Sequence, residues 1–493
     1  MRNILAIVVT AIFLLSSANA ADKNVAKAMK AFEGKEYNRA ISILSPALPN
    51  LSGEDKDLAN LSLGIVMLKN GELHREFFRS SIDGNIEYLS GLHAAKSKRK
   101  STLAPLYLGE AYLHKGDYRN SIKYFSSGLK TKSLTSEQRD VAESLLGLAF
   151  YKSGNKAKAN STWESVKGKS SVVDTTLLAA KHRAGLKVTY DVNSLHQRFV
   201  KEDSASTPVS SRHISNLVYL FTEAGDYDKA LNVLESSQVD SPSDREISKD
   251  DKQISFYDIA ILDNISKLMK SASVKHLELA SSSPKLGSTA NFYLMDSGVI
   301  FGDAQRITQA SNTLASMQLP KSLAKYTPVK VKAGDYMGGQ KTKATDAWKQ
   351  IISQNSSDPA MLAEVLSMCV YTEADCKSAL DSARSVSATG QGRKYTGINA
   401  AIGRYLLKHN NAKQALEYLE LARDKSNKNK ISANDPMLLV DLAEAYRSEK
   451  TYSEHLEIYF EMNHHFPVVR QIQEAVQGTY ATQQKSAGDV KIF

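Results

Sequence analysis

The sequence predicts an all-α fold, an α-solenoid built from stacked helical hairpins. Across most of the 493 residues, apolar side chains recur three or four positions apart, as on one face of a helix. Alternating β-branched runs and proline-rich segments are few. One order of small and large residues also recurs along the chain with mostly different amino acids, which is typical of a repeat architecture. The chain is therefore expected to be helical nearly throughout.

The recurring order is clearest in Leu106–Phe125 and Leu217–Leu234, which align on a shared Gly-Asp-Tyr. Gly116 and Gly225 suit the left-handed end of a first helix, and the aspartate after each suits the cap of a second helix. Small residues at fixed offsets let the two helices cross closely, and large residues fill the space between them. The aligned positions are Leu108, Gly109, Tyr112, Ser121, Phe125 and Gly128 in one copy, and Leu217, Val218, Phe221, Ala230, Leu234 and Ser237 in the other.

Further copies occur along the chain in the same pattern. An N-terminal hairpin keeps Ala28, Tyr37, Ala40, Leu44 and Ala47, and a degenerate copy begins at Leu63 and Gly64 with a second half that does not fit. The better copies contain Leu146, Gly147, Phe150, Ala159, Trp163 and Val166, then Ile402, Gly403, Leu406, Ala415, Leu419 and Ala422, and finally Leu442, Ala443, Tyr446, His455, Tyr459, Met462 and Pro467. His455 stands where a small residue is expected, which predicts splayed helices there. Leucine at Gly109 or Gly147 should overpack a crossing, and Gly128, near a helix end, should tolerate it better.

One apparent copy is in the wrong register. Gly334-Asp335-Tyr336 reproduces the turn, but that register would place Pro328 inside a helix, at a cost of about 3 kcal/mol. A shift of five residues moves Pro328 to the helix start and aligns Gly339, Ala344, Trp348 and Ile351. The shifted register is preferred.

These copies, each a hairpin of about 34 residues, resemble the tetratricopeptide repeat family. The resemblance implies a superhelix whose first helices line a concave groove that binds a partner. By register, the groove residues are Leu106, Glu110, Leu113, Ser144, Leu148, Tyr151, Arg404 and Leu407. The lysine and asparagine with which some family members clamp a carboxylate are absent, which favours apolar peptide segments over acidic chain ends. Glu110, Tyr151 and Arg404 are expected to be exposed, whereas the leucines could equally pack between helices.

The chain is expected to divide into five parts. Residues 1–20 have the pattern of a signal peptide, with Arg2, an apolar run at Ile4–Leu15 and a small-residue cleavage site ending at Ala20. The run is too short to span a bilayer, and no cysteine near the junction could carry a lipid. Residues 21–235 form one solenoid, 236–327 degenerate repeats or a linker, 328–475 a second solenoid with a capping helix, and 476–493 a flexible tail.

No catalytic or cofactor motif is present. The sequence has no phosphate-binding loop, nucleophile elbow or zinc-protease pair, and Ser322 and Lys325 match S-x-x-K by chance. Glu461, His464 and His465 form the densest group of potential metal ligands, but a surface helix end explains them better because no further ligand motif is visible. We therefore expect no enzyme activity, no cofactor and no metal.

The two cysteines, Cys369 and Cys376, predict a disulfide. On one continuous helix their α-carbons would lie about 10.5 Å apart, whereas a disulfide requires less than about 7 Å. A bond therefore requires a turn at Thr372–Asp375, which is plausible there and favoured in an oxidising compartment. Two free buried thiols are the alternative.

The sequence thus favours a non-enzymatic periplasmic scaffold for a cell-envelope assembly, such as a secretion, pilus, motility or exopolysaccharide machine. Its partners would be envelope proteins or peptide segments. The net charge of +10 is moderate for this length, and no aromatic-basic motif indicates nucleic acid. No transmembrane segment would remain after signal cleavage. A periplasmic holdase or assembly chaperone is the alternative.

Overall fold

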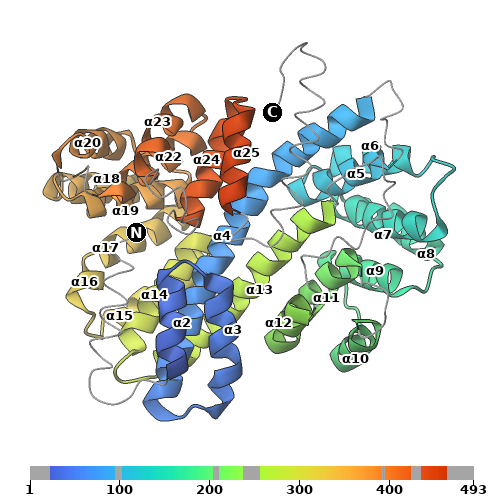
Figure 1. Ribbon diagram of the computed structural model, residues 1–493, viewed down its shortest axis with the longest axis horizontal. Helices are drawn as coiled ribbons and strands as arrows, with labels where there is room; N and C mark the ends of the chain where they lie inside the picture. Colours follow the sequence, from blue (N-terminus) through green and yellow to red (C-terminus); the bar gives the residue numbers. More distant parts are fainter. Residues whose placement is uncertain are drawn as a thin grey trace. The chain divides into compact units, whose positions relative to one another are not determined.

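The computed structural model describes residues 23–94, 103–203, 210–236, 256–390, 392, 395–423 and 435–462 (Figure 1). Within these ranges the regular structure is entirely helical, which confirms the predicted all-α solenoid of hairpins. The predicted signal peptide, its cleavage site and the C-terminal tail lie outside the described residues.

The described helices form two compact units. Unit 1 contains the described residues up to Leu73 and those from Met269 onward, and unit 2 contains those within His74–Leu268. Two long helices, α4 (Gly53–Ala94) and α13 (Phe256–Ser281), contribute residues to both. In sequence, unit 2 is therefore an insertion into unit 1. This division does not follow the linear boundaries near residues 236 and 328 that the repeat pattern suggested.

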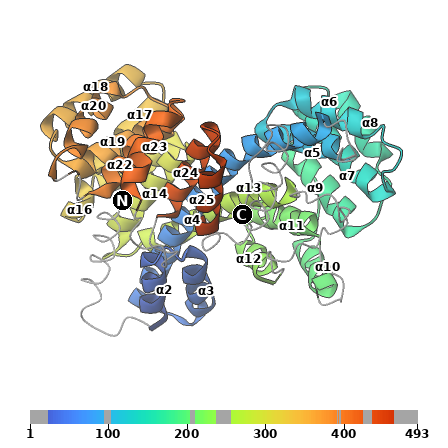
Figure 2. The same ribbon diagram turned by 45° about the horizontal axis from the view of Figure 1, so that its top comes forward.

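Unit 1 consists of helical hairpins, seen in Figures 1 and 2 as successive pairs in dark blue and then from yellow to red. The pairs are α2 (Lys23–Glu33) with α3 (Tyr37–Ala47), α14 (Gly287–Phe301) with α15 (Ala304–Leu314), α17 (Thr327–Met337) with α18 (Lys341–Gln354), α19 (Pro359–Thr372) with α20 (Lys377–Ser387), α22 (Thr396–Lys408) with α23 (Ala412–Ala422), and α24 (Pro436–Ser448) with α25 (Tyr452–Met462). A 3₁₀ turn, η1 (Leu48–Asn50), and the short α16 (Lys321–Ala324) lie between pairs.

Unit 2 is also built from helical hairpins. Its hairpins are α5 (Ala104–Lys115) with α6 (Tyr118–Gly128), α7 (Ser136–Lys152) with α8 (Lys156–Ser165), and α11 (Ser211–Glu223) with α12 (Tyr227–Ser236). Helices α9 (Ser171–Arg183) and α10 (Val192–Asp203) lie between the last two hairpins in sequence.

Small residues permit the close helix crossings, as predicted. A Cβ atom on Gly109 would lie 2.7 Å from Cγ of Phe125, and one on Gly147 would overlap the Trp163 indole. The indole nitrogen of Trp163 also donates a hydrogen bond of 2.9 Å to the Ser144 carbonyl, which ties α8 to α7. The expectation that Gly128 is less crowded is wrong, since a Cβ there would overlap Leu106 of α5. Gly128 lies at the end of α6, but that end still packs against α5.

The turn between the two helices of a hairpin contains a residue with left-handed backbone geometry. Gly339, with φ of 95°, holds this place between α17 and α18, whereas Gly334 lies inside α17. Pro328 stands in the first turn of α17. The shifted register is therefore confirmed.

His455 does not splay its hairpin. Its side chain is buried between α24 and α25, and Nδ1 lies 2.7 Å from the Ala443 carbonyl oxygen. The small residue at position 443 leaves room for the ring opposite, and the carbonyl gives the ring a polar partner.

One hairpin of unit 1 is discontinuous in sequence. Ser273 of α13 donates a hydrogen bond of 2.7 Å to the Gly64 carbonyl of α4, and a Cβ on Gly64 would lie 2.6 Å from Cγ of Leu277. His276 bonds to Asn60 and Lys285 to Glu54, so the two segments run antiparallel. Gly64 and Leu277 thus repeat the relation of Gly109 to Phe125. The copy that starts at Leu63 and Gly64 has its second helix in α13, after the whole of unit 2.

Candidate functional site

In unit 2, the first helices of successive hairpins line a recess of about 110 Å³. Eight of its thirteen lining residues are apolar or aromatic, and five are polar or charged. The lining comprises Leu103, Leu106, Tyr107 and Glu110 from the α5 segment, Phe125 of α6, Glu137, Gln138, Val141, Ala142 and Leu145 of α7, Val172 of α9, and Ser210 and Arg212 of the α11 segment. Leu106 and Glu110, two of the predicted groove residues, are among them.

Glu110 forms a buried ion pair with Arg212. Nη2 of Arg212 donates to Oε2 of Glu110 over 2.7 Å, and each residue is at most 5% exposed. Burial raises the pKa of the Glu110 carboxyl, and the neighbouring Arg212 guanidinium opposes that rise. The pair joins α5 to α11 across 102 positions of sequence. Glu110 therefore lines the recess as a buried, paired carboxylate and is not the exposed probe expected from the sequence.

Most of the other predicted groove residues are structural. Leu113 and Leu148 lie in the core of unit 2, and Leu407 is buried in unit 1. Ser144 is fully buried, with its hydroxyl donating to the Asp140 carbonyl. Tyr151 is half-buried and stacks on Trp163 at 6.0 Å between ring centroids.

Arg404 is likewise buried rather than exposed. Its guanidinium donates to Oδ2 of Asp441 at 2.7–2.8 Å and to the Met437 carbonyl at 3.4 Å, so it joins α22 to α24. Burial by itself lowers the pKa of Arg404, but Asp441 more than offsets this and the pKa is raised. The arginine therefore holds two adjacent hairpins together.

Unit 1 contains a second cavity, of about 80 Å³, that the sequence analysis did not identify. Most of its lining residues are aromatic or charged, and the lining comes from the α2–α3 hairpin and the first helices α4, α14, α17, α19 and α24. The aromatic residues are Phe32, Tyr37, Phe292, Tyr293, Tyr326 and Tyr371, and the charged ones are Lys35, Lys69, Glu72, Asp296, Lys330, Glu364 and Asp435.

The charges around this cavity form a chain of ion pairs. Lys330 lies 2.6 Å from Asp296 and 2.6 Å from Glu364, and Lys69 lies 2.9 Å from Glu72 and 3.7 Å from Asp296. Burial alone would lower the pKa of Lys330, but Asp296 and Glu364 raise it overall. Both lysines therefore stay protonated in the folded protein.

The positions of these charges follow the repeat. Glu110, Asp296 and Arg404 each stand six residues before the left-handed residue of their hairpin turn, at Gly116, Gly302 and Asn410. Lys330, Glu364 and Asp441 each stand nine residues before theirs, at Gly339, Glu373 and Lys450. Asp296 pairs with Lys330, and Arg404 pairs with Asp441. In both cases, the charged residue six positions before the turn of one hairpin meets the opposite charge nine positions before the turn of the next hairpin. This periodicity of charge was visible in the sequence, once the turns were placed.

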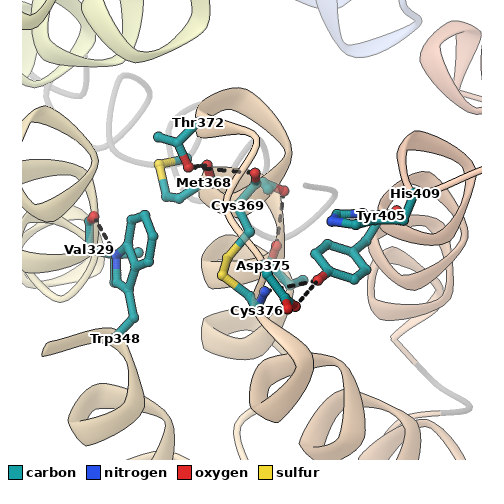
Figure 3. Close-up of a disulfide and its surroundings, with 11 residues drawn as sticks. Val329, Trp348, Met368, Cys369, Thr372, Asp375, Cys376, Tyr405 and His409 are labelled. Carbon is teal, nitrogen blue, oxygen red and sulfur yellow. Dashed lines mark hydrogen bonds between the residues drawn. A yellow bond between two sulfur atoms is a disulfide. The ribbon is translucent and has the colours of Figure 1, made fainter. Parts of the chain in front are cut away.

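Cys369 and Cys376 form the predicted disulfide (Figure 3). Their α-carbons lie 6.2 Å apart because α19 ends at Thr372 and Glu373 adopts left-handed geometry. The hydroxyl of Tyr405, from the next first helix, accepts the Cys376 backbone N–H at 2.9 Å and donates to Asp375 at 3.3 Å. The disulfide therefore closes a turn that α22 also holds.

Within the described ranges, no three His, Cys, Asp or Glu side chains are grouped so that they could hold a metal ion. Glu461, one of the three potential ligands named in the sequence analysis, pairs with Arg423, and His464 and His465 lie outside those ranges. In the same part of the chain, no helix is long and apolar enough to cross a membrane.

No protein-family model matches the chain, and no curated protein matches it. It is similar to the solved structure of the APC/C hetero-tetramer Cut9–Hcn1, with 13% identity over 95% of this chain and 98% of that one, at a TM-score of 0.27. It is also similar to yeast Tom70, with 11% identity over 93% and 95% and a TM-score of 0.32, and to the P58(IPK) TPR domain, with 13% identity over 79% and 99% and a TM-score of 0.21. These scores are all below 0.5, so the assignment of the fold rests on the helix packing described above.

Proposed function

We propose that the protein is a non-enzymatic scaffold that binds segments of partner proteins in the recess of unit 2. The observation that carries this proposal is the composition of that recess. First helices of successive hairpins converge on it, most of its lining residues are apolar or aromatic, and the buried Glu110–Arg212 pair lies among them. An apolar recess with a few fixed polar groups suits a partner segment that buries an apolar side chain and donates or accepts a hydrogen bond.

The proposed location is the periplasm, in a cell-envelope assembly. Two features support it. Residues 1–20 have the pattern of a cleavable export signal, and the chain carries a disulfide, a bond that persists in oxidising compartments. The partners would then be other envelope proteins.

The recess is tested by placing one charge in its apolar lining. Val172 of α9 lines the recess and is only partly buried, so aspartate there places a charge in the apolar wall without removing a core residue. The full-length Val172→Asp protein and the wild type are used to capture partners from envelope extract, and the captured proteins are quantified by mass spectrometry. We expect at least a tenfold loss of the stoichiometric partners at an unchanged melting temperature.

Val200→Asp is the matched control, since Val200 lies on α10 of the same unit and is 48% exposed. It should retain every partner. Equal capture by both variants would contradict recognition in the recess. Capture of no defined partner, together with suppression of aggregation of unrelated proteins, would favour a holdase.

A further inference from the structure

The cavity of unit 1 has more negative than positive groups. Three ammonium groups, from Lys35, Lys69 and Lys330, face four carboxylates, from Glu72, Asp296, Glu364 and Asp435. Every ammonium is already paired, with Lys35 lying 3.7 Å from Asp435. The cavity therefore has no spare cation for an anionic ligand, and two of its carboxylates, Asp296 and Glu364, share the ammonium of Lys330.

Glu364 is the carboxylate with unused capacity. Glu364 is 8% exposed, and its Oε1 lies 2.6 Å from Nζ of Lys330, an ammonium that it shares with Asp296. The same lysine donates a well-formed hydrogen bond of 2.6 Å to Asp296. A buried carboxylate that shares its cation with a second carboxylate is only partly compensated, and a ligand ammonium would supply the missing positive charge.

Two tyrosines add further unused groups. Tyr37 and Tyr293 line the cavity and are more than nine-tenths buried, and neither hydroxyl has a hydrogen-bond partner among the described residues. Burial raises the pKa of Tyr293, so its ring carries a neutral hydroxyl. Neutral phenol oxygens accept hydrogen bonds from ammonium groups, and aromatic faces attract cations.

We propose that the cavity of unit 1 binds an alkylammonium group, with Glu364 as its counter-ion and the hydroxyls of Tyr37 and Tyr293 as further acceptors. The volume of about 80 Å³ limits the ligand. Since a single water needs roughly 10–15 Å³ on this measure, the space holds a few heavy atoms in a row and not a helix or strand. The end of a lysine side chain and a small free amine are the two sources of this chemistry. Amine binding does not depend on partner binding in the recess of unit 2, because the residues proposed for it all lie in unit 1.

The test is calorimetric titration of the full-length protein at pH 7 with n-butylamine, with n-butanol and butyrate as neutral and anionic analogues. We expect saturable binding of the amine and none of the analogues. A short peptide with one central lysine distinguishes the sources. Binding of the peptide at least as tight as that of butylamine assigns the site to a partner's side chain, and binding of butylamine alone assigns it to a free amine.

Two variants connect the binding to these residues. Glu364→Gln keeps the shape but removes the excess charge, and should weaken amine binding at least tenfold. Tyr293→Phe removes a hydroxyl on which no described residue depends, so it should weaken binding severalfold with an unchanged melting temperature, even if Glu364→Gln fails to fold. Tyr151→Phe in unit 2 is the control and should bind as the wild type does. Absence of saturable amine binding, or unchanged binding in Tyr293→Phe and Glu364→Gln, would overturn the proposal.

Discussion

A double-mutant cycle between Gly64 and Leu277 measures the discontinuous hairpin directly. Leu277 is fully buried, and substitution of a buried leucine by alanine costs about 2–5 kcal/mol. Alanine in place of glycine inside a helix would normally gain about 1 kcal/mol. At Gly64 the new Cβ would lie 2.6 Å from Cγ of Leu277, and overpacking of this kind costs about 1–3 kcal/mol.

The two changes should therefore be coupled. In the wild-type background Gly64→Ala should leave the free energy of unfolding unchanged or lower it by up to about 2 kcal/mol. In the Leu277→Ala background the obstructing side-chain atoms are gone, and the same change should raise it by up to about 1 kcal/mol. The expected coupling energy is about 1–3 kcal/mol.

Urea unfolding followed by tryptophan fluorescence provides the assay. The chain has two tryptophans, Trp163 in unit 2 and Trp348 in unit 1, so a Trp163→Phe background makes the signal specific to unit 1. Leu419→Ala is the matched control, because this buried leucine packs on Gly403 and not on Gly64. Gly64→Ala and Leu419→Ala should be additive within about 0.5 kcal/mol. If Gly64→Ala and Leu277→Ala were equally additive, the pairing of α4 with α13 would be refuted.

Three further predictions concern stability. Arg404→Met should lower the free energy of unfolding by about 3–5 kcal/mol, because it leaves Asp441 buried without a counter-ion, and Asp441→Leu added to it should restore most of the loss in urea unfolding. Replacing Cys369 and Cys376 together by alanine should cost about 2–3 kcal/mol, and a melting temperature equal to that of the oxidised wild type would contradict this. Burial lowers the pKa of His455 to about 4, below its unfolded value of about 6.5, so the unfolded state binds the proton first. Its contribution to the free energy of unfolding should be constant above pH 6.5 and fall by about 1.4 kcal/mol per pH unit from there towards pH 4. In urea unfolding at pH 7 and pH 5, the wild type should therefore lose more stability than His455→Asn does between the two pH values, by about 1.4 kcal/mol for each unit below pH 6.5.

The sequence by itself determined the helical hairpins, their register and the disulfide. Each glycine and its aromatic partner lie within one helical hairpin, Gly109 with Phe125 and Gly147 with Trp163. Only the turn and part of each helix separate them, so the spacing of small and large residues specifies their contact. The choice between Gly334 and Gly339 was likewise local, because proline excludes one register. Such features depend on backbone geometry within about 34 residues, and the amino-acid order contains that geometry.

Only the tertiary structure decided which segments meet across longer distances. Gly64 appeared to lack a second helix because its partner, Leu277, follows an insertion of a whole unit. Glu110 and Arg404 stood at positions that line a groove in the repeat pattern, yet the stacking of hairpins buries them against Arg212 and Asp441. Helix periodicity shows which face of a helix is turned inward. What that face meets depends on how the hairpins stack, and the stacking energy is a sum over residues far apart in the chain.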